Sequence, residues 1–331
     1  MTESQYDVVA IGNAIVDVLA QADDGFLAAH DIAKGAMTLI EEPRAHAIYA
    51  AMGPAVEISG GSAANTMVGL AGLGGRAAFI GKVRNDQLGE VFAHDIRAAG
   101  VHFATPPATE GPATARCFIL VTPDAQRSMN TFLGVSSLLE PSDLDPTLIA
   151  AGRTVYLEGY LFDRPEAKDA FYRAAAIAHG SGREVALTLS DAFCVGRHRA
   201  AFQHLVESEV DILFANEAEI TALYEVDGFD AALQIVRRKC RLAALTRSAA
   251  GSVIVSGEEV HVVPAEPVAK VVDTTGAGDL FAAGFLFGLA RGRDLGTCGR
   301  FGSLAAAEII SHLGARPETS LNALATGKGL L

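Results

Sequence analysis

The sequence is poor in cysteine and in basic residues, and its hydrophobic runs are short. Its four cysteines, Cys117, Cys194, Cys240 and Cys298, are far apart and form no C-x-x-C pair. This spacing argues against a disulfide framework and against a cysteine zinc site. The nine histidines include no H-E-x-x-H motif, so a histidine metal site is not expected either.

Positive charge is also scarce. Lysine and arginine number 26 against 39 aspartates and glutamates, a net charge of −13, which disfavours nucleic acid and anionic membrane as partners. The apolar run at 280–290 falls short of the ~18 to 20 residues that span a bilayer. The first residues show no basic segment followed by an apolar one, the pattern of a signal peptide. We therefore expect a cytoplasmic protein.

Half of the 331 residues are hydrophobic, so a sizeable core is available. Short apolar runs alternate with alanine-rich stretches such as EAKDAFYRAAAIAHG; the runs are YDVVAIG, AAFIGKV, RTVYLEGYL, EVALTLS, VDILFAN, RLAALT and GSVIVSG. This alternation predicts an α/β fold with a mostly parallel central sheet and helices on both faces. Ligands of such sheets bind at the carboxyl ends of the strands.

Two segments, at about 18–42 and 102–134, interrupt the alternation. The second contains TARCFILVT and RSMNTFL, which have the composition of strands. We expect them to form a small separate sheet. Because no internal repeat or long linker is present, we expect one domain over 1–331, with this sheet inserted in it.

The stretch DTTGAGDLFAAGF, residues 273–285, is the strongest candidate for chemistry. Gly276, Ala277 and Gly278 precede an apolar helical run, and backbone N–H groups at a helix start bind anions. Asp279 follows directly, where it could accept the proton of a hydroxyl that attacks a bound phosphoryl group. The alternative is that Asp279 only stabilises the helix dipole.

Two further stretches carry polar side chains suited to a hydroxylated ligand. In EISGGSAANT, Gly61 permits a tight turn and Asn65 lies about one helical turn later. In GNAIVD, Asn13 and Asp17 follow the first predicted strand. An amide and a carboxylate together can hold a vicinal diol.

The stretch ILFANEAEI places Asn216 and Glu219 three residues apart at the end of a predicted strand. The spacing is that of a helix capping box. It also suits a Mg²⁺ ion held through water by Glu219 and bound mainly to substrate phosphates. The two interpretations are compatible.

Together these motifs resemble the ribokinase, or PfkB, family of carbohydrate kinases. GGSAANTMVGLAGLGG with FIGKVRNDQLGE is similar to its first signature, and DTTGAGDLFAAGFLFGL to its second. The likeness extends from AIGNAIVDV to SLAAAEIISHLGA. It implies a ribokinase-like fold with a small β-sheet lid and a phosphotransferase acting on an alcohol. It further implies ATP and Mg²⁺, allows a monovalent cation such as K⁺ near Asp273, and fits a monomer or a homodimer.

Within the family the nearest likeness is to the adenosine kinase branch, through GNAIVD, LSDAF, VDILFANEAE and GGSAAN, in which Ser62 stands where ribokinases usually have lysine. The implied reaction is transfer of the γ-phosphate of ATP to the 5′-hydroxyl of a nucleoside, adenosine first. The implied base is Asp279. The implied substrate residues are Asn13, Asp17, Gly61, Ser62 and Asn65 for the ribose, Tyr160 and Phe193 near the base, and Leu133 and Val135 on the lid segment. The implied nucleotide residues are Asn216, Thr246, Gly251, Gly278 and Ser303, with Glu219 for the metal.

The sequence departs from the branch at three places. Thr246 is followed by Arg247 and Ser248 instead of the family's Thr-x-Gly turn. Tyr160 replaces an expected phenylalanine, and Asp191 and Ala192 also differ. The first departure concerns the nucleotide contacts at that turn, and the other two concern the substrate more than the reaction.

Two alternatives to a nucleoside kinase remain open at this stage. One is a sugar kinase of the same family, acting on ribose or fructose. The other is a serine hydrolase, because GGSAA is a loose nucleophile elbow around Ser62. It would need a later histidine such as His261 or His312.

Overall fold

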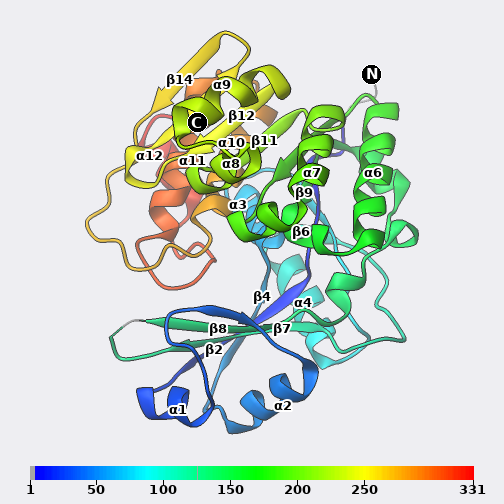
Figure 1. The fold of residues 1–331 in the computed structure, drawn as a ribbon, viewed down its shortest axis with the longest axis vertical. Coiled ribbons are helices and arrows are strands. Elements are labelled where there is room, and N and C mark those ends of the chain that lie inside the picture. The colour runs from blue at the N-terminus through cyan, green and yellow to red at the C-terminus, as the bar shows by residue number, and fades with distance from the viewer. Residues whose placement is uncertain (1–3, 125) are drawn as a thin grey trace.

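Most of the chain is built around one large sheet, drawn in the upper half of Figure 1. The structure is a computed structural model that describes residues 4–124 and 126–331. In these residues the sheet has nine strands in the order β14-β13-β12-β11-β10-β9-β1-β5-β6. In that order they are Glu259–Val263, Ser252–Ser256, Leu242–Thr246, Ile212–Asn216, Glu184–Thr188, Gly152–Glu158, Tyr6–Ile11, Ala77–Ile80 and Val101–Phe103. Neighbours from β12 to β6 are parallel, whereas β13 and β14 are antiparallel, which confirms the mostly parallel sheet.

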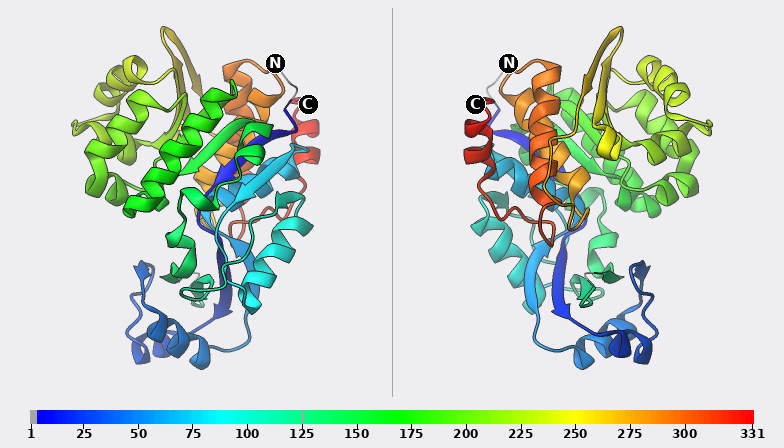
Figure 2. Two further views of the ribbon diagram at one scale, coloured as in Figure 1. Left: turned by 90° about the vertical axis from the view of Figure 1, so that its right-hand side faces the viewer. Right: turned by 90° about the vertical axis from the view of Figure 1, so that its left-hand side faces the viewer.

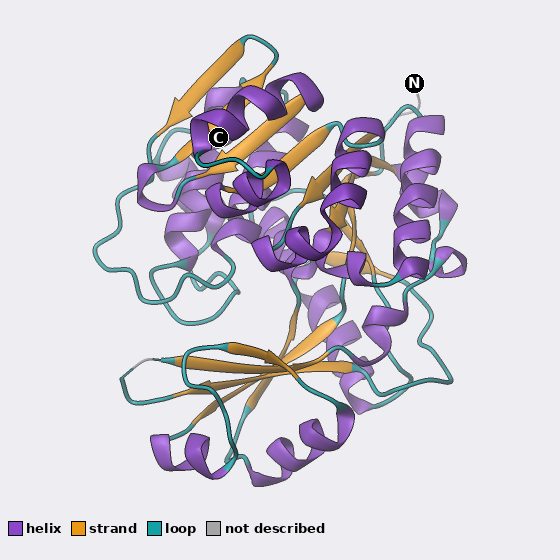
Figure 3. Ribbon diagram, in the orientation of Figure 1, coloured by secondary structure: helices purple, strands orange, loops and turns teal. Residues whose placement is uncertain are grey.

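Helices cover both faces of this sheet, as Figure 3 shows. Strand β1 is buried on both sides: Val8 and Ala10 pack toward one set of helices, and Val9 and Ile11 toward the other. The first set is α3 (Ser62–Gly72), α4 (Gln87–Ala98), α10 (Ala277–Ala290), α11 (Leu295–Ile309) and α12 (Leu321–Gly327). The second set is α5 (Pro146–Ala151), α6 (Pro165–Gly180), α7 (Ala192–Ser208), α8 (Glu217–Tyr224) and α9 (Phe229–Lys239).

A second, smaller sheet projects from one end of the molecule, and both views in Figure 2 show it separated from the large sheet. Its order is β3-β8-β7-β2-β4, which are Met37–Leu39, Arg127–Phe132, Ala115–Val121, Ile15–Gln21 and Val56–Gly60. The lid expected from the sequence is therefore present. It also takes β4, which lies outside the two expected segments, whereas β6 pairs with β5 in the large sheet. The division of the chain into domains stays a prediction.

The two faces of the small sheet have different surroundings. Val16 and Val18 of β2 are buried together with residues of α1 (Asp24–Ala29) and α2 (Glu42–Ala51), which lie below the sheet in Figure 1. The alternate residues, among them Asp17, point to the opposite face. The Asp17 carboxylate therefore lies on the face of the small sheet that α1 and α2 do not cover.

Short 3₁₀ helices occupy several connections: η1 (Gly134–Leu138), η2 (Pro141–Asp143), η3 (Gly159–Asp163) and η4 (Ser248–Ala250). Helix α10 is the most buried helix of its size, because every residue from Leu280 to Gly288 is inside the core. Among the described residues, no helix has the length and hydropathy to cross a membrane.

Candidate active site

Asp279 lies in the first turn of α10. Gly276 precedes the helix with a left-handed backbone, φ 77°, a conformation that favours glycine. The Ala277 N–H donates to the Thr274 carbonyl at 3.2 Å. Among the described residues, no partner outside the helix is found for the N–H groups of Gly278 and Asp279, so both are available as donors at the helix start. A Cβ at Gly278 would meet nothing within 4 Å, so open space lies beside the proposed anion site.

Two side chains of α3 hold the Asp279 carboxylate. Ser62 Oγ donates to Oδ1 at 2.6 Å, and Asn65 Nδ2 donates to Oδ2 at 3.3 Å. Burial raises the pKa of Asp279 to about 6, although both hydrogen bonds and the charge of Arg316 oppose the rise. Asn65 Oδ1 is buried and has no hydrogen-bond partner in the part of the chain that the structure describes. A buried acceptor without a donor is costly, so it is available for a ligand hydroxyl beside Asp279.

Asp17 reaches the same region from the small sheet. Gly60 makes this approach possible, because a Cβ at that position would lie 2.5 Å from the Asp17 carboxyl carbon. Burial raises the pKa of Asp17 to about 6, against the attraction of Arg316 and Arg127. Two aspartates far apart in sequence, Asp17 and Asp279, thus lie close enough to influence each other's ionisation.

The side chain of Asn13 has two protein partners and keeps further hydrogen-bonding capacity. Its amide donates to Glu158 Oε1 at 2.8 Å and accepts from Ser136 Oγ at 2.9 Å. Gly61 packs against it, because a Cβ there would overlap the Asn13 carbonyl oxygen. The backbone of Gly61 has φ 94°, again a glycine conformation.

Sequence reasoning missed Glu158, the last residue of β9. It is buried and also accepts from the Ala63 N–H at 2.8 Å, so it ties the start of α3 to Asn13. Burial raises its pKa to about 7. The available signal was an acid at the carboxyl end of a central strand, where ligand sites form.

Sequence reasoning also missed the pairing of Arg127 in β8 with Asp273. Both side chains are more than nine-tenths buried, and the pair connects the small sheet to the segment before the glycine turn. Asp273 also accepts from Thr275 and from the Gly314 N–H. A monovalent cation near Asp273 stays a prediction.

The residues predicted to surround a base differ in exposure. Val135 in η1 is buried, and Leu133 directly precedes that helix. Tyr160 in η3 is 37% exposed, and burial together with the charges of Asp191 and Asp279 raises its pKa. Phe193 in α7 is 83% exposed and is the least enclosed of this group.

Three of the residues predicted to contact the nucleotide, Asn216, Thr246 and Gly251, lie at the ends of neighbouring strands, whereas Ser303 lies in α11. Asn216 pairs in register with Thr246 of β12, so the ends of β11 and β12 lie together. Gly251 adopts φ 84°, and its carbonyl accepts from the Arg247 N–H at 2.7 Å. Ser303 Oγ accepts from the Glu266 N–H at 2.8 Å.

Asn216 and Glu219 form a complete capping box. The Glu219 N–H donates to Asn216 Oδ1, and the Asn216 N–H donates to Glu219 Oε2, both at 2.9 Å. Burial raises the pKa of Glu219 to about 7. Among the described residues, no group of three or more His, Cys, Asp or Glu side chains could hold a metal ion. A Mg²⁺ beside Glu219 would therefore take most ligands from phosphates and water, which suits this ion.

The variant Glu219→Gln separates capping from metal binding, because glutamine can also complete a capping box. At pH 8, where Glu219 is ionised, we expect the Mg²⁺ concentration for half-maximal activity to rise about tenfold. Tm should fall only slightly, because glutamine keeps the bond from the Asn216 N–H and loses the one from Asn216 Nδ2. Glu217→Ala, in the same turn, is the control. An unchanged Mg²⁺ dependence would leave Glu219 with the capping role alone.

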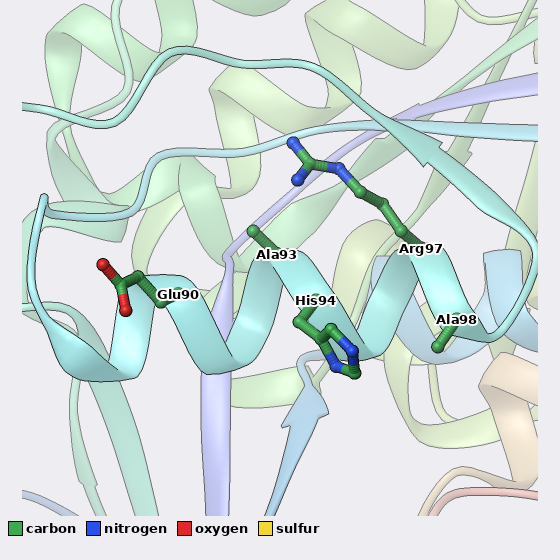
Figure 4. A pocket seen from close by; sticks show the side chains of 5 residues that line it. All are labelled: Glu90, Ala93, His94, Arg97 and Ala98. Carbon is green, nitrogen blue, oxygen red and sulfur yellow. The ribbon is translucent and has the colours of Figure 1, made fainter.

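The hydrolase arrangement is not formed. Ser62 donates to Asp279, while His261 contacts Glu259 and His312 contacts Glu308. A surface hollow lined by Glu90, Ala93, His94, Arg97 and Ala98 lies along α4 and contains none of the site residues (Figure 4). The polar side chains near Asp279 come instead from α3, with Ser62 and Asn65, and from β2 of the small sheet, with Asp17.

Comparisons with known proteins agree with this geometry. The pfkB family carbohydrate kinase model matches residues 51–321. The solved adenosine kinase from Sinorhizobium meliloti is 55% identical, with a TM-score of 0.90 over 98% of this chain and 100% of that one. A probable sugar kinase from Rhizobium etli CFN 42 is 50% identical, with a TM-score of 0.92 over 99% and 100%. An adenosine kinase of Saccharomyces cerevisiae is 26% identical over 93% of this chain and 95% of its own length.

The family match covers most of the chain, and the fold is shared with the solved relatives over nearly their whole length. The glycine turn, the acid that follows it and the small lid sheet are all present in the structure. The reaction is accordingly phosphoryl transfer to an alcohol group of a small molecule, in a family that uses ATP and Mg²⁺. The chain belongs to the pfkB family of carbohydrate kinases.

Proposed function

We propose that this kinase transfers the γ-phosphate of ATP to the 5′-hydroxyl of a nucleoside, and that adenosine is its preferred acceptor. The observation that carries the proposal is the unpartnered Asn65 Oδ1 beside Asp279, since a ribose hydroxyl would satisfy it. The 55% identity to an adenosine kinase supports the choice of acceptor.

Asp279 acts as the general base. Its carboxylate accepts the proton of the attacking hydroxyl while Ser62 and Asn65 keep it oriented. The N–H groups of Gly278 and Asp279 stabilise the charge that develops on the transferred phosphoryl group. Mg²⁺, when bound, neutralises charge on the phosphates, and Glu219 is the residue we assign to it.

The small sheet acts as a lid over the acceptor. Asp17 holds ribose hydroxyls from the lid side, with Asn13 and Gly61 on the opposite side. Leu133, Val135, Tyr160 and Phe193 surround the base. Exclusion of water favours transfer over hydrolysis of ATP, and the Arg127–Asp273 pair is a contact that holds the lid against the large sheet. Whether the protein is a monomer or a homodimer stays a prediction.

A sugar kinase is the second candidate, favoured by the 50% identity to a probable sugar kinase and by the hydroxyl that Tyr160 adds. A free sugar would not fill the space that a base would occupy. Turnover of ribose or fructose above that of every nucleoside would replace the first proposal with the second.

The test is ADP release from Mg-ATP by the purified protein with adenosine, guanosine, inosine, cytidine, ribose and fructose as acceptors. We expect adenosine to give the highest kcat/KM. The hydrophobic and hydrogen-bonded base contacts of a fitted acceptor are worth about 10-fold or more over a poorly fitted one. Release that is the same without any acceptor would contradict the proposal.

The pH dependence of kcat/KM should report the ionisation of the proposed base, Asp279. Because Asp279 must be ionised and its pKa is raised to about 6, we expect kcat/KM, measured at saturating Mg²⁺, to level off above that pH. It should fall about tenfold per unit as the pH drops below it. Circular dichroism across the same range controls for unfolding. An acid limb centred near pH 4 would show that Asp279 titrates like an exposed carboxyl or is not the base.

A further inference from the structure

Arg316, in the loop between α11 and α12, reaches across to the opposite side of the site. Its Nε donates to the Ser59 carbonyl at 2.9 Å, and Nη1 donates to the Ala64 carbonyl at 3.2 Å. Nη2 donates to Ser59 Oγ at 2.8 Å and also contacts the Ser59 carbonyl. All three nitrogens of the Arg316 guanidinium thus donate to the segment from Ser59 to Ala64.

That stretch carries the acceptor-binding groups. Ser59 lies two residues before Gly61, and Ala64 directly precedes Asn65. Gly60 and Gly61 give this backbone more conformational freedom than other residues would. The planar guanidinium of Arg316 donates to both ends of the segment and so restricts its conformation. Ser59 is also held by Asp95 of α4, which accepts from its N–H at 2.8 Å and from its hydroxyl at 2.5 Å.

The charge of Arg316 matters because acids converge on the site from four elements. Asp279 comes from α10, Asp17 from β2, Glu158 from β9 and Glu219 from α8, and Asp279 repels the other three. Arg316 attracts both Asp17 and Asp279, and burial lowers its own pKa to about 10. Arg127 attracts Asp17.

We propose that Arg316 is a positioning residue for the phosphoryl acceptor, which holds the segment from Ser59 to Ala64 in place beside Asp17 and Asp279. This rests on the proposed roles of Asp279 as base and of Asn65 as a ligand of the acceptor. Arg316 does not contact the acceptor in this scheme. It acts through the backbone that it holds and through its charge.

Two substitutions separate the clamp from the charge. Arg316→Gln removes both, so the acid limb of kcat/KM should move to higher pH, because Asp279 loses an attracting cation. The KM for the acceptor should rise by about 10- to 100-fold through misplacement of Asn65. Arg316→Lys keeps the charge without the planar fork, so its acid limb should stay near that of the wild type while the acceptor KM still rises.

The matched control is Arg291→Gln. Like Arg316, Arg291 donates to a backbone carbonyl, that of Gly74; it also pairs with Asp7, and it lies at the far end of α10. It should alter neither the acid limb nor the acceptor KM. The KM for ATP should stay within about twofold of wild type in all three variants, because the segment that Arg316 holds carries none of the residues assigned to the nucleotide.

The outcomes are distinct. An Arg316→Gln protein with the wild-type acid limb and acceptor KM would overturn the inference, while wild-type turnover on the same acceptor would leave the proposed function standing. If Arg316→Gln does not fold by circular dichroism, Arg316→Lys decides, and an unchanged acceptor KM in that variant overturns the clamp. Failure of the wild type to phosphorylate any acceptor contradicts the proposed function itself.

Discussion

Replacement of Asp279 by asparagine is expected to lower kcat by at least about a thousandfold. Asparagine has nearly the same shape, and its amide oxygen can still accept from Ser62, which now donates to Asp279 at 2.6 Å. It cannot take up a proton at neutral pH. The variant should therefore fold and bind ATP almost as the wild type does, yet fail in proton transfer.

The measurement is ADP release with adenosine, beside calorimetric ATP binding and thermal unfolding. Asp294→Asn is the control. Asp294 also stands at the start of a helix, where it caps α11 by accepting from the Thr297 N–H. Asparagine caps a helix about as well as aspartate does. The Asp294→Asn variant should keep wild-type activity. Turnover of Asp279→Asn within about tenfold of wild type would mean that Asp279 is not the base.

The largest expected loss of stability comes from Gly284→Ala. Helices α10 and α11 approach so closely there that a Cβ at residue 284 would lie 2.5 Å from the Phe301 carbonyl carbon and 2.7 Å from the Gly302 nitrogen. Both are backbone atoms, so a helix would have to move. We expect a loss of about 3 kcal/mol, and a Tm lower by several degrees. Activity should also fall, because α10 carries Asp279.

Gly196→Ala is the matched comparison. Gly196 lies within α7, is exposed, and its added Cβ would meet nothing within 4 Å. Alanine should stabilise that helix by up to about 1 kcal/mol. Equal Tm values for the two variants, measured by circular dichroism, would show that α10 and α11 can separate at this point without cost.

Local sequence patterns predicted several elements correctly. The capping box of Asn216 and Glu219 is present as expected, because it depends only on residues three apart. The apolar run after Asp279 forms α10. The alternation of apolar runs and helices predicted the parallel sheet, since strands buried on both faces need continuous apolar residues.

Strand assignment between the two sheets was less predictable. The run VEISG precedes a glycine turn and a helix just as strands of the large sheet do, yet β4 pairs with β2 in the lid. Pairing of strands far apart in sequence depends on the tertiary arrangement, and periodicity does not encode it. The same limit applies to β6, which joins the large sheet.

The sequence by itself therefore indicated the reaction class, through its resemblance to the two PfkB signatures, and offered Asp279 as the candidate base, because a glycine turn, an acid and an apolar helix are adjacent along the chain. Only the tertiary structure decided how the charges around Asp279 are arranged. Glu158, Arg127 and Arg316 reach the site from separate elements. Their roles come from burial and from long-range contacts, which bring together side chains that no local pattern connects.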